Sequence, residues 1–157
     1  MRLNRLARSA AGFSLLELMI VVTVVAILAA IAYPSYMLQI RQSRRTEART
    51  AIMDLTSREE RFFSTNGANY TAAAASLGYP ALPTVVGSGY YQVTVCSPAC
   101  APSTIATAPS YTVTATPVAG QSQALDTACQ SFSVDSTGKQ FAFDNGGANN
   151  TVTCWTQ

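Results

Sequence analysis

One carboxylate stands alone in the most apolar stretch of the chain. Glu17 lies in an apolar run from Phe13 to about Leu38 that contains no other charged residue. An acidic side chain in the middle of a bilayer costs about 2.5 to 3.5 kcal/mol, and a signal peptide gains nothing from it. In a protein that leaves the lipid and packs against its own copies, a partner's positive charge can neutralise the carboxylate. We therefore expect Glu17 to act between subunits and not in folding.

Four cysteines, Cys96, Cys100, Cys129 and Cys154, form the second group of side chains with chemistry of their own. A four-cysteine zinc site uses two close pairs, and only Cys96 and Cys100 are close. The chain has no histidine to complete a mixed zinc site. An even cysteine count behind an apolar N-terminal segment is typical of disulfides in an oxidising compartment. We expect disulfides and no metal site.

Catalytic constellations are missing from the sequence. There is no histidine, no G-x-S-x-G motif, no phosphate-binding loop and no acidic pair in an acid/base context. We therefore expect no enzymatic activity and no cofactor. After Phe62 the chain carries only Lys139 against Asp126, Asp135 and Asp144, so we expect no direct nucleic-acid binding by this part.

The N-terminal segment predicts a membrane helix. The chain has 157 residues, 48% hydrophobic and only 11% charged, which suits contact with lipid or with another subunit. Residues 1–12 carry Arg2, Arg5 and Arg8 and no acid, and about 20 of the apolar residues that follow would span a ~30 Å hydrocarbon core. Ala30-Ile31-Ala32 could serve as a secretory cleavage site, but the run exceeds the ~7 to 15 residues of a signal-peptide core.

The stretch Gly12-Phe13-Ser14-Leu15-Leu16-Glu17, followed by an apolar helix with Pro34, resembles the cleavage and methylation motif of type IV prepilins. The resemblance implies cleavage between Gly12 and Phe13 by a prepilin peptidase, and N-methylation of Phe13. It gives residues 1–12 the role of a leader and residues 13–38 that of a transmembrane and assembly helix. The new amine of Phe13 would then neutralise Glu17 of a neighbouring subunit.

Orientation in the membrane does not follow from charge alone, because arginines flank the apolar run on both sides. The cysteines favour a C-terminal domain outside the cytoplasm. We expect a single-pass inner-membrane protein with a periplasmic domain, which later becomes part of an extracellular filament.

The remaining chain predicts an α+β fold, with the long N-terminal helix packed on a small antiparallel β-sheet. Residues 39–65 form an amphipathic helix that Asn66-Gly67 ends, and Pro34 is a hinge or a bend in the same helix. Residues 66–89 are an irregular connection, and residues 90–157 hold the sheet. The expected strands are Tyr90–Val95, Tyr111–Thr116, Phe132–Asp135 and Gln140–Phe143, with a possible short strand at Val152–Trp155. Ser136-Thr137-Gly138 predicts a hairpin between the third and fourth strands.

Asn66–Thr71, the Gly89-Tyr90-Tyr91 stretch and the closing Cys154-Trp155 are most similar to minor pilins of the PilE type. The resemblance implies a type IV pilus subunit, minor favoured over major, in a filament for motility, adhesion or DNA uptake. Its partners would be other pilins, the prepilin peptidase and the inner-membrane assembly machinery. The alternatives are a pseudopilin of a type II secretion system and, less favoured, a secreted domain that binds DNA or another ligand.

We predict the disulfides Cys96–Cys100 and Cys129–Cys154. The second would close a loop of about 26 residues and stabilise the fold by roughly 3 kcal/mol in a chain-entropy treatment. The alternatives Cys96–Cys154 and Cys100–Cys129 stay open at the level of sequence.

Overall fold

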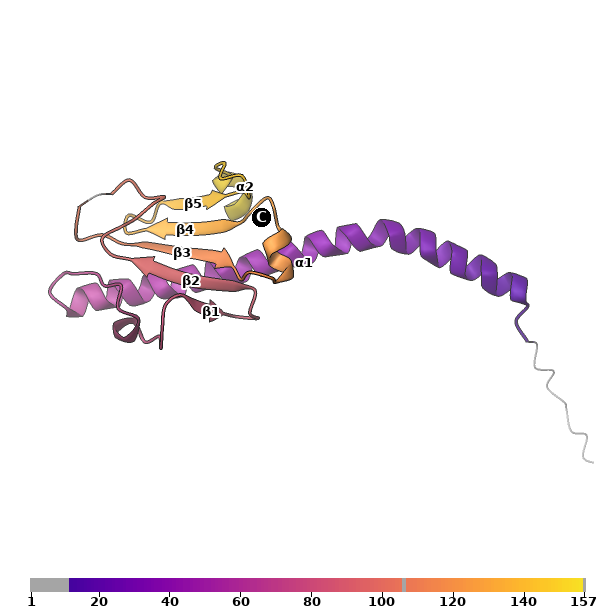
Figure 1. Ribbon diagram of the computed structural model, residues 1–157, viewed down its shortest axis with the longest axis horizontal. Helices are drawn as coiled ribbons and strands as arrows, with labels where there is room; N and C mark the ends of the chain where they lie inside the picture. Colours follow the sequence, from indigo (N-terminus) through magenta and orange to yellow (C-terminus); the bar gives the residue numbers. More distant parts are fainter. Residues whose placement is uncertain (1–11, 106, 157) are drawn as a thin grey trace, which may run out of the picture. The chain divides into compact units, whose positions relative to one another are not determined.

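The computed structural model describes residues 12–105 and 107–156 of the chain. The chain divides into two compact units at Leu38 and Gln39. Helix α1 (Leu15–Thr65) contributes its first half to the N-terminal unit and its second half to the C-terminal unit, which we call the head. In Figure 1, α1 changes colour from indigo to magenta along its length.

The N-terminal unit is helical from Leu15 onward. Leu, Met, Ala, Ile and Val fill this stretch, and the helical assignment continues through Pro34 without a break. Every residue from 12 to 36 is exposed within the single chain. The first half of α1 therefore presents its apolar side chains on the surface of its own unit, which is expected for a surface that meets lipid or other subunits.

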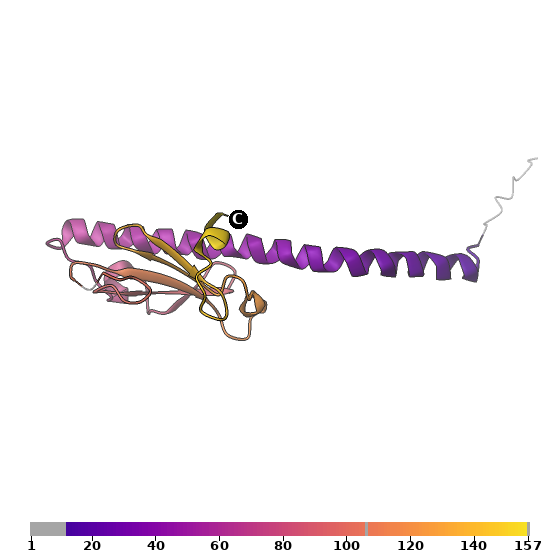
Figure 2. The same cartoon turned by 90° about the horizontal axis from the view of Figure 1, so that it is seen from above.

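The head contains a five-stranded antiparallel sheet in the order β1-β2-β3-β4-β5. The strands are β1 (Thr84–Val86), β2 (Tyr91–Cys96), β3 (Thr112–Pro117), β4 (Ser131–Asp135) and β5 (Gln140–Phe143). Two 3-10 turns, η1 (Ala74–Leu77) and η2 (Ser122–Leu125), precede β1 and β4, and a short helix, α2 (Thr151–Thr156), closes the chain. Figure 2 shows the second half of α1 along one face of this sheet. The α+β fold expected from the sequence is confirmed.

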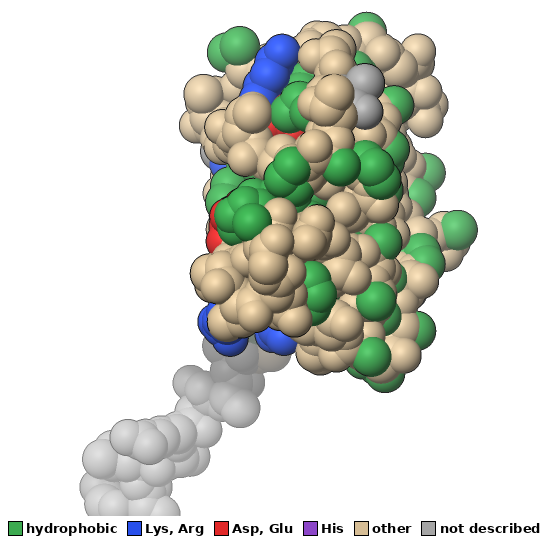
Figure 3. Space-filling view, turned by 90° about the vertical axis from the view of Figure 1, so that its left-hand side faces the viewer, with side chains coloured by type: hydrophobic (Ala, Val, Ile, Leu, Met, Phe, Trp, Pro, Cys, Tyr) green, Lys and Arg blue, Asp and Glu red, His purple; other side chains and the backbone are tan. Residues whose placement is uncertain are grey.

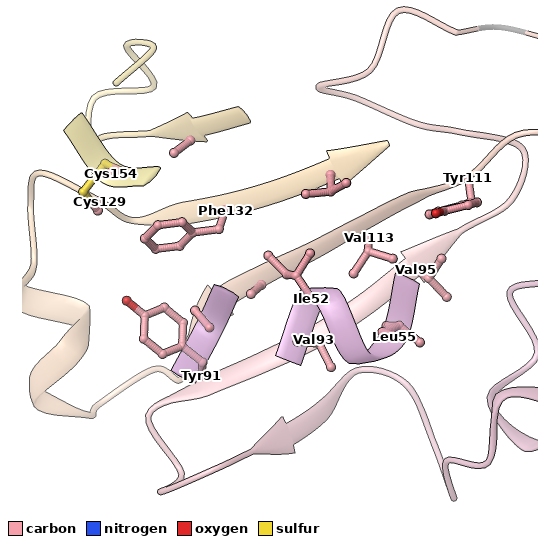
Figure 4. Packing of buried hydrophobic residues seen from close by; sticks show 14 of the residues in the cluster. Ile52, Leu55, Tyr91, Val93, Val95, Tyr111, Val113, Cys129, Phe132 and Cys154 are labelled. Carbon is pink, nitrogen blue, oxygen red and sulfur yellow. A yellow bond between two sulfur atoms is a disulfide. The ribbon is translucent and has the colours of Figure 1, made fainter. Parts of the chain in front are cut away.

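Alternation along the strands explains how the core forms. Successive residues of β2 are buried and half-buried in turn, so one face of the strand meets α1 and the other meets solvent. Ile52 and Leu55 of α1 are fully buried and lie against Val93 and Val113 of the sheet (Figure 4). The opposite face is polar, and on it the hydroxyls of Thr114 and Ser133 lie 3.0 Å apart on neighbouring strands.

Two local expectations are confirmed. Helix α1 ends at Thr65, directly before Asn66-Gly67, and Gly67 adopts the left-handed φ of 67° that favours glycine there. Strands β4 and β5 pair as a hairpin, with Val134 opposite Gln140. Asp135 stabilises the turn, because its Oδ1 accepts hydrogen bonds from the backbone N–H groups of Thr137 and Lys139.

Two other expectations are wrong. Residues 84–86 form an edge strand within the stretch expected to be irregular, because Val85 pairs with Gln92 of β2. Residues 151–156 are helical instead of extended: Asn149 Oδ1 accepts the N–H of Thr151 at 3.1 Å, and Asn150 C=O accepts the N–H of Cys154. These contacts override the strand preference of the Thr-Val-Thr sequence.

Candidate processing and assembly site

The start of α1 is capped by a residue that the sequence analysis did not single out. Ser14 Oγ accepts a hydrogen bond from the backbone N–H of Glu17 at 3.1 Å, and Ser14 C=O accepts the N–H of Leu18 at 3.2 Å. This is an N-cap, and serine followed three residues later by glutamate is its sequence signature. The spacing of Ser14 and Glu17 could have revealed it. The cap fixes where Glu17 stands in the first helical turn.

The carboxylate of Glu17 has no partner within the part of the chain that the structure describes. Its side chain is exposed, and the bond to Ser14 Oγ comes from the backbone N–H of Glu17 and not from its carboxylate. A negative charge in the first turn is favourable, because unpaired backbone N–H groups give the helix N-terminus a partial positive charge. Neutralising the carboxylate itself requires a group from outside the chain.

The expected cleavage position is open. Gly12 has nothing within 4 Å of the place where a Cβ would stand, and Phe13 is 78% exposed. The peptide bond between them is therefore accessible in the free chain. The leader residues 1–11, with Arg2, Arg5 and Arg8, lie outside the described residues, so cleavage and methylation remain predictions.

Helix α1 is long and apolar enough to cross a membrane. The stretch from Leu15 to Leu38 would measure about 36 Å at 1.5 Å per residue, against a hydrocarbon core of about 30 Å. Among its polar residues, Thr23 satisfies its hydroxyl within the helix by donating to Met19 C=O at 2.8 Å. Length and composition thus permit a membrane span. The role of Pro34 as a hinge stays a prediction.

In the head, a buried ion pair joins α1 to the segment before β4. Arg45 Nε and Nη2 donate to Asp126 Oδ2 and Oδ1 at 2.7 and 2.9 Å, and both residues are buried. Gln123 Nε2 donates to Asp126 Oδ2 and to the hydroxyl of Tyr91, each at 3.0 Å. Burial raises the pKa of Tyr91 to about 12, so it remains a neutral phenol. No local signal could have indicated a pair whose partners lie 81 residues apart.

The C-terminal end of the head is held by covalent and polar contacts. The structure contains the disulfides Cys96–Cys100 and Cys129–Cys154, the pairs expected from the sequence. Trp155 donates its indole N–H to Phe141 C=O at 3.0 Å. The second disulfide therefore joins α2 to the segment before β4, whereas the first is confined to the end of β2 and the loop after it.

The head contains more charged residues than those that follow Phe62 in the sequence. Because the second half of α1 belongs to the head, its arginines must be counted with the sheet: Arg41, Arg44, Arg45, Arg49, Arg58 and Arg61. Several of them are engaged: Arg44 lies 3.6 Å over the ring of Tyr90, and Arg58 pairs with Asp54 at 2.8 Å. In the end-on view of Figure 3, basic atoms occupy small areas between hydrophobic and uncharged ones.

Two family models match consecutive parts of the chain. The model described as "Prokaryotic N-terminal methylation motif" matches residues 7–33, and the one described as "Type IV minor pilin ComP, DNA uptake sequence receptor" matches residues 34–133. The first covers the expected cleavage position and Glu17. The second covers the second half of α1 and the sheet into β4. No curated protein matches the chain.

Proposed function

Because the chain belongs to the ComP family of type IV minor pilins, which are structural pilus subunits and not enzymes, we propose that it is processed after Gly12 and polymerised from the inner membrane into a pilus for DNA uptake. The single observation that carries the assembly step is Glu17, a carboxylate on an exposed apolar helix with no partner in its own chain among the described residues. The family match favours this function over a type II secretion pseudopilin.

The assembly step follows from the charges at the helix start. Cleavage after Gly12 creates a positive amine on Phe13, where the N-terminus of α1 already carries a partial positive charge, so the amine is unfavourable there. The carboxylate of Glu17 is equally unfavourable in an apolar environment. When two processed subunits pack side by side, the amine of one and the carboxylate of the other neutralise each other. This pairing requires the prepilin peptidase and other pilin subunits as partners.

The orientation that we propose places the head in the periplasm before assembly. Both disulfides lie in the head, and disulfides persist in an oxidising compartment. The leader arginines then remain on the cytoplasmic side. Because arginines flank the apolar run on both sides, the disulfides and not the charges support this orientation.

The assembly step is tested by replacing Glu17 with Ala. We expect cleavage and stability of the head to be unchanged, and incorporation into sheared filaments to fall at least tenfold. Thr23→Ala is the matched control, since Thr23 also lies on this helix but bonds only to Met19 C=O within the chain. If Glu17→Ala subunits assembled as well as the Thr23→Ala subunits, the charge-pairing mechanism would be wrong.

A second proposed activity is contact between the head and DNA, which the family description supports and which goes against our expectation from the sequence. The second half of α1 adds six arginines to the head, together with the acids Glu47, Asp54, Glu59 and Glu60. Among these arginines Arg61 is exposed, and with Arg58, Asn66 and Ser76 it lines an open cavity of about 380 Å³. A guanidinium in such a position can neutralise one backbone phosphate.

Binding of double-stranded DNA to the full chain in neutral detergent micelles tests this activity. Affinity should fall with added salt, and Arg61→Gln should reduce the slope of the logarithm of affinity against the logarithm of salt concentration by about one. Lys139→Gln serves as the matched control, because Lys139 lies over the Phe141 ring in another part of the head. Equal slopes for wild type and Arg61→Gln would remove Arg61 from the interface.

A further inference from the structure

Glu59 is a carboxylic acid sealed inside the head near the end of α1. Its exposed fraction is zero, although it lies between the exposed or half-exposed residues Arg58 and Glu60. Oε2 accepts a hydrogen bond from the backbone N–H of Thr71 at 3.1 Å. Oε1 is buried and has no hydrogen-bond partner among residues 12–105 and 107–156. A buried polar atom without a partner is rare in proteins and calls for a physical explanation.

The groups around Glu59 do not neutralise a negative charge. Within the described residues no basic side chain forms an ion pair with it, and the adjacent carboxylate of Glu60 repels a negative charge there. The hydroxyls of Tyr70, from the loop after α1, and Tyr111, directly before β3, donate to Glu60 Oε1 at 3.2 and 3.0 Å. Both nearby phenol donors therefore serve Glu60 and not Glu59.

The loop between α1 and β1, residues 66–83, is attached to α1 at this point. Thr71 donates its N–H to Glu59, and its own Oγ1 accepts the N–H of Ala73, which directly precedes η1. Tyr70 stacks on Phe63 of α1 with ring centroids 4.6 Å apart. At the start of the loop, the hydrogen bond from Thr71 to Glu59 thus stands beside the contacts of Tyr70 with Phe63 and Glu60. The end of the loop is held separately, because Leu77 C=O accepts from Arg58 and the Tyr79 hydroxyl donates to Asp54.

We propose that Glu59 is a pH-sensitive latch, whose neutral carboxyl group holds the start of the 66–83 loop on α1 and whose ionisation releases it. The geometry requires the neutral form, because an ionised Glu59 would have one backbone donor, one oxygen without a partner and a second carboxylate beside it. A buried charge in that environment is costly, and opening of the loop around Thr71 would admit water to it.

The direction of the effect follows from proton linkage. Burial, opposed by the hydrogen bond from Thr71 and assisted by the charge of Glu60, raises the pKa of Glu59 to about 7. A glutamate exposed by opening of the loop would lose its proton near its ordinary value of about 4.3. At a pH between about 4.3 and about 7, Glu59 carries a proton when the loop is closed and has lost it when the loop is open. The closed loop therefore becomes less stable as pH rises. The opening equilibrium should increase about tenfold between pH 6 and pH 8.

The test is amide hydrogen exchange of Thr71, measured by NMR on the full chain in detergent micelles and divided by the intrinsic rate at each pH. Wild type should lose about tenfold in protection between pH 6 and pH 8. Glu59→Gln keeps an acceptor for Thr71 and cannot ionise, so its protection should not change over this range. Constant wild-type protection, or an equal loss in Glu59→Gln, would overturn the proposal.

Two further measurements keep the test decisive if Glu59→Gln does not fold. The ¹³C shift of the Glu59 carboxyl group in wild type should titrate near pH 7, the pH above which the protection of Thr71 levels off. A midpoint near 4.5 would overturn the latch. Glu60→Gln is the matched control, because it retains acceptors for Tyr70 and Tyr111 but removes the neighbouring charge. In Glu60→Gln, the carboxyl group of Glu59 should still titrate, but with a midpoint below that of wild type. An unchanged midpoint would contradict the proposed repulsion between Glu59 and Glu60.

Discussion

Replacement of Asp126 by Ala should destabilise the head more than any change to an exposed charge. Asp126 and Arg45 are only 3% and 5% exposed to solvent, and two hydrogen bonds join them. Loss of one partner from a buried ion pair costs about 3 to 5 kcal/mol, because the other charge stays buried without it. Gln123 would also lose an acceptor, which adds about 1 kcal/mol. For a domain of this size the pair term alone corresponds to a drop in Tm of roughly 12 to 20 °C.

The fluorescence of Trp155 is the appropriate assay. It is the only tryptophan of the chain, and it packs edge-on against Phe132 in the core, so it reports unfolding of the head and not of the membrane helix. Thermal and denaturant unfolding should be measured on the full chain in detergent micelles. Asp54→Ala is the matched control, because it removes only surface contacts, the pair with Arg58 and the hydrogen bond from the Tyr79 hydroxyl, which together should cost about 1 to 2 kcal/mol.

Replacement of both partners separates the value of the pair from the cost of an isolated charge. A double variant, Arg45→Met with Asp126→Leu, leaves no buried charge, so it should be more stable than Asp126→Ala alone. If Asp126→Ala lost no more stability than Asp54→Ala, or if the double variant were less stable than the single one, the proposed role of the buried pair would be refuted.

The remaining predictions concern processing and the disulfides. Gly12→Val should block cleavage and leave full-length protein in the membrane, because a branched side chain would occupy space where the peptidase needs close approach to the backbone; intact mass decides this. A mature wild-type chain that began at Tyr33 would establish a secretory signal peptide instead. Peptide mapping without reduction should give Cys96–Cys100 and Cys129–Cys154, and any other crosslink would contradict the structure. Replacement of both Cys129 and Cys154 by Ser should cost about 3 kcal/mol, measured by the same Trp155 fluorescence.

Local sequence was enough to predict much of the architecture. Helix α1 could be predicted because a long apolar run without glycine, continued by helical periodicity and stopped at Asn66-Gly67, contains its own signals. Strands β2 to β5 followed from alternation, and the β4–β5 hairpin from the turn at Ser136-Thr137-Gly138. The Ser14 cap was missed although its signal, a serine three residues before Glu17, was present.

The two incorrect predictions, for residues 84–86 and 151–156, have a common cause. Strand β1 has only three residues, and it is extended because β2 offers a pairing partner. Helix α2 contains strand-forming residues, yet Asn149 caps it and the disulfide from Cys154 attaches it to Cys129. In both segments, contacts with residues outside the segment outweigh its local preference, as is common for short elements.

By itself, the sequence was enough to propose the chemistry of the N-terminal segment, because the roles that we propose for Gly12, Phe13 and Glu17 depend on the local backbone and on partners outside the chain. Only the tertiary structure decided the electrostatics of the head. Nothing in the sequence distinguishes Arg45 and Asp126 from charges on a surface. Only folding brings the two side chains together in the interior of the head. Glu59 and Glu60 are equivalent neighbours in the sequence, but α1 directs the first into the core and the second toward two tyrosine hydroxyls. Burial and hydrogen bonding set the energy of a charge, and both depend on residues far away in the chain.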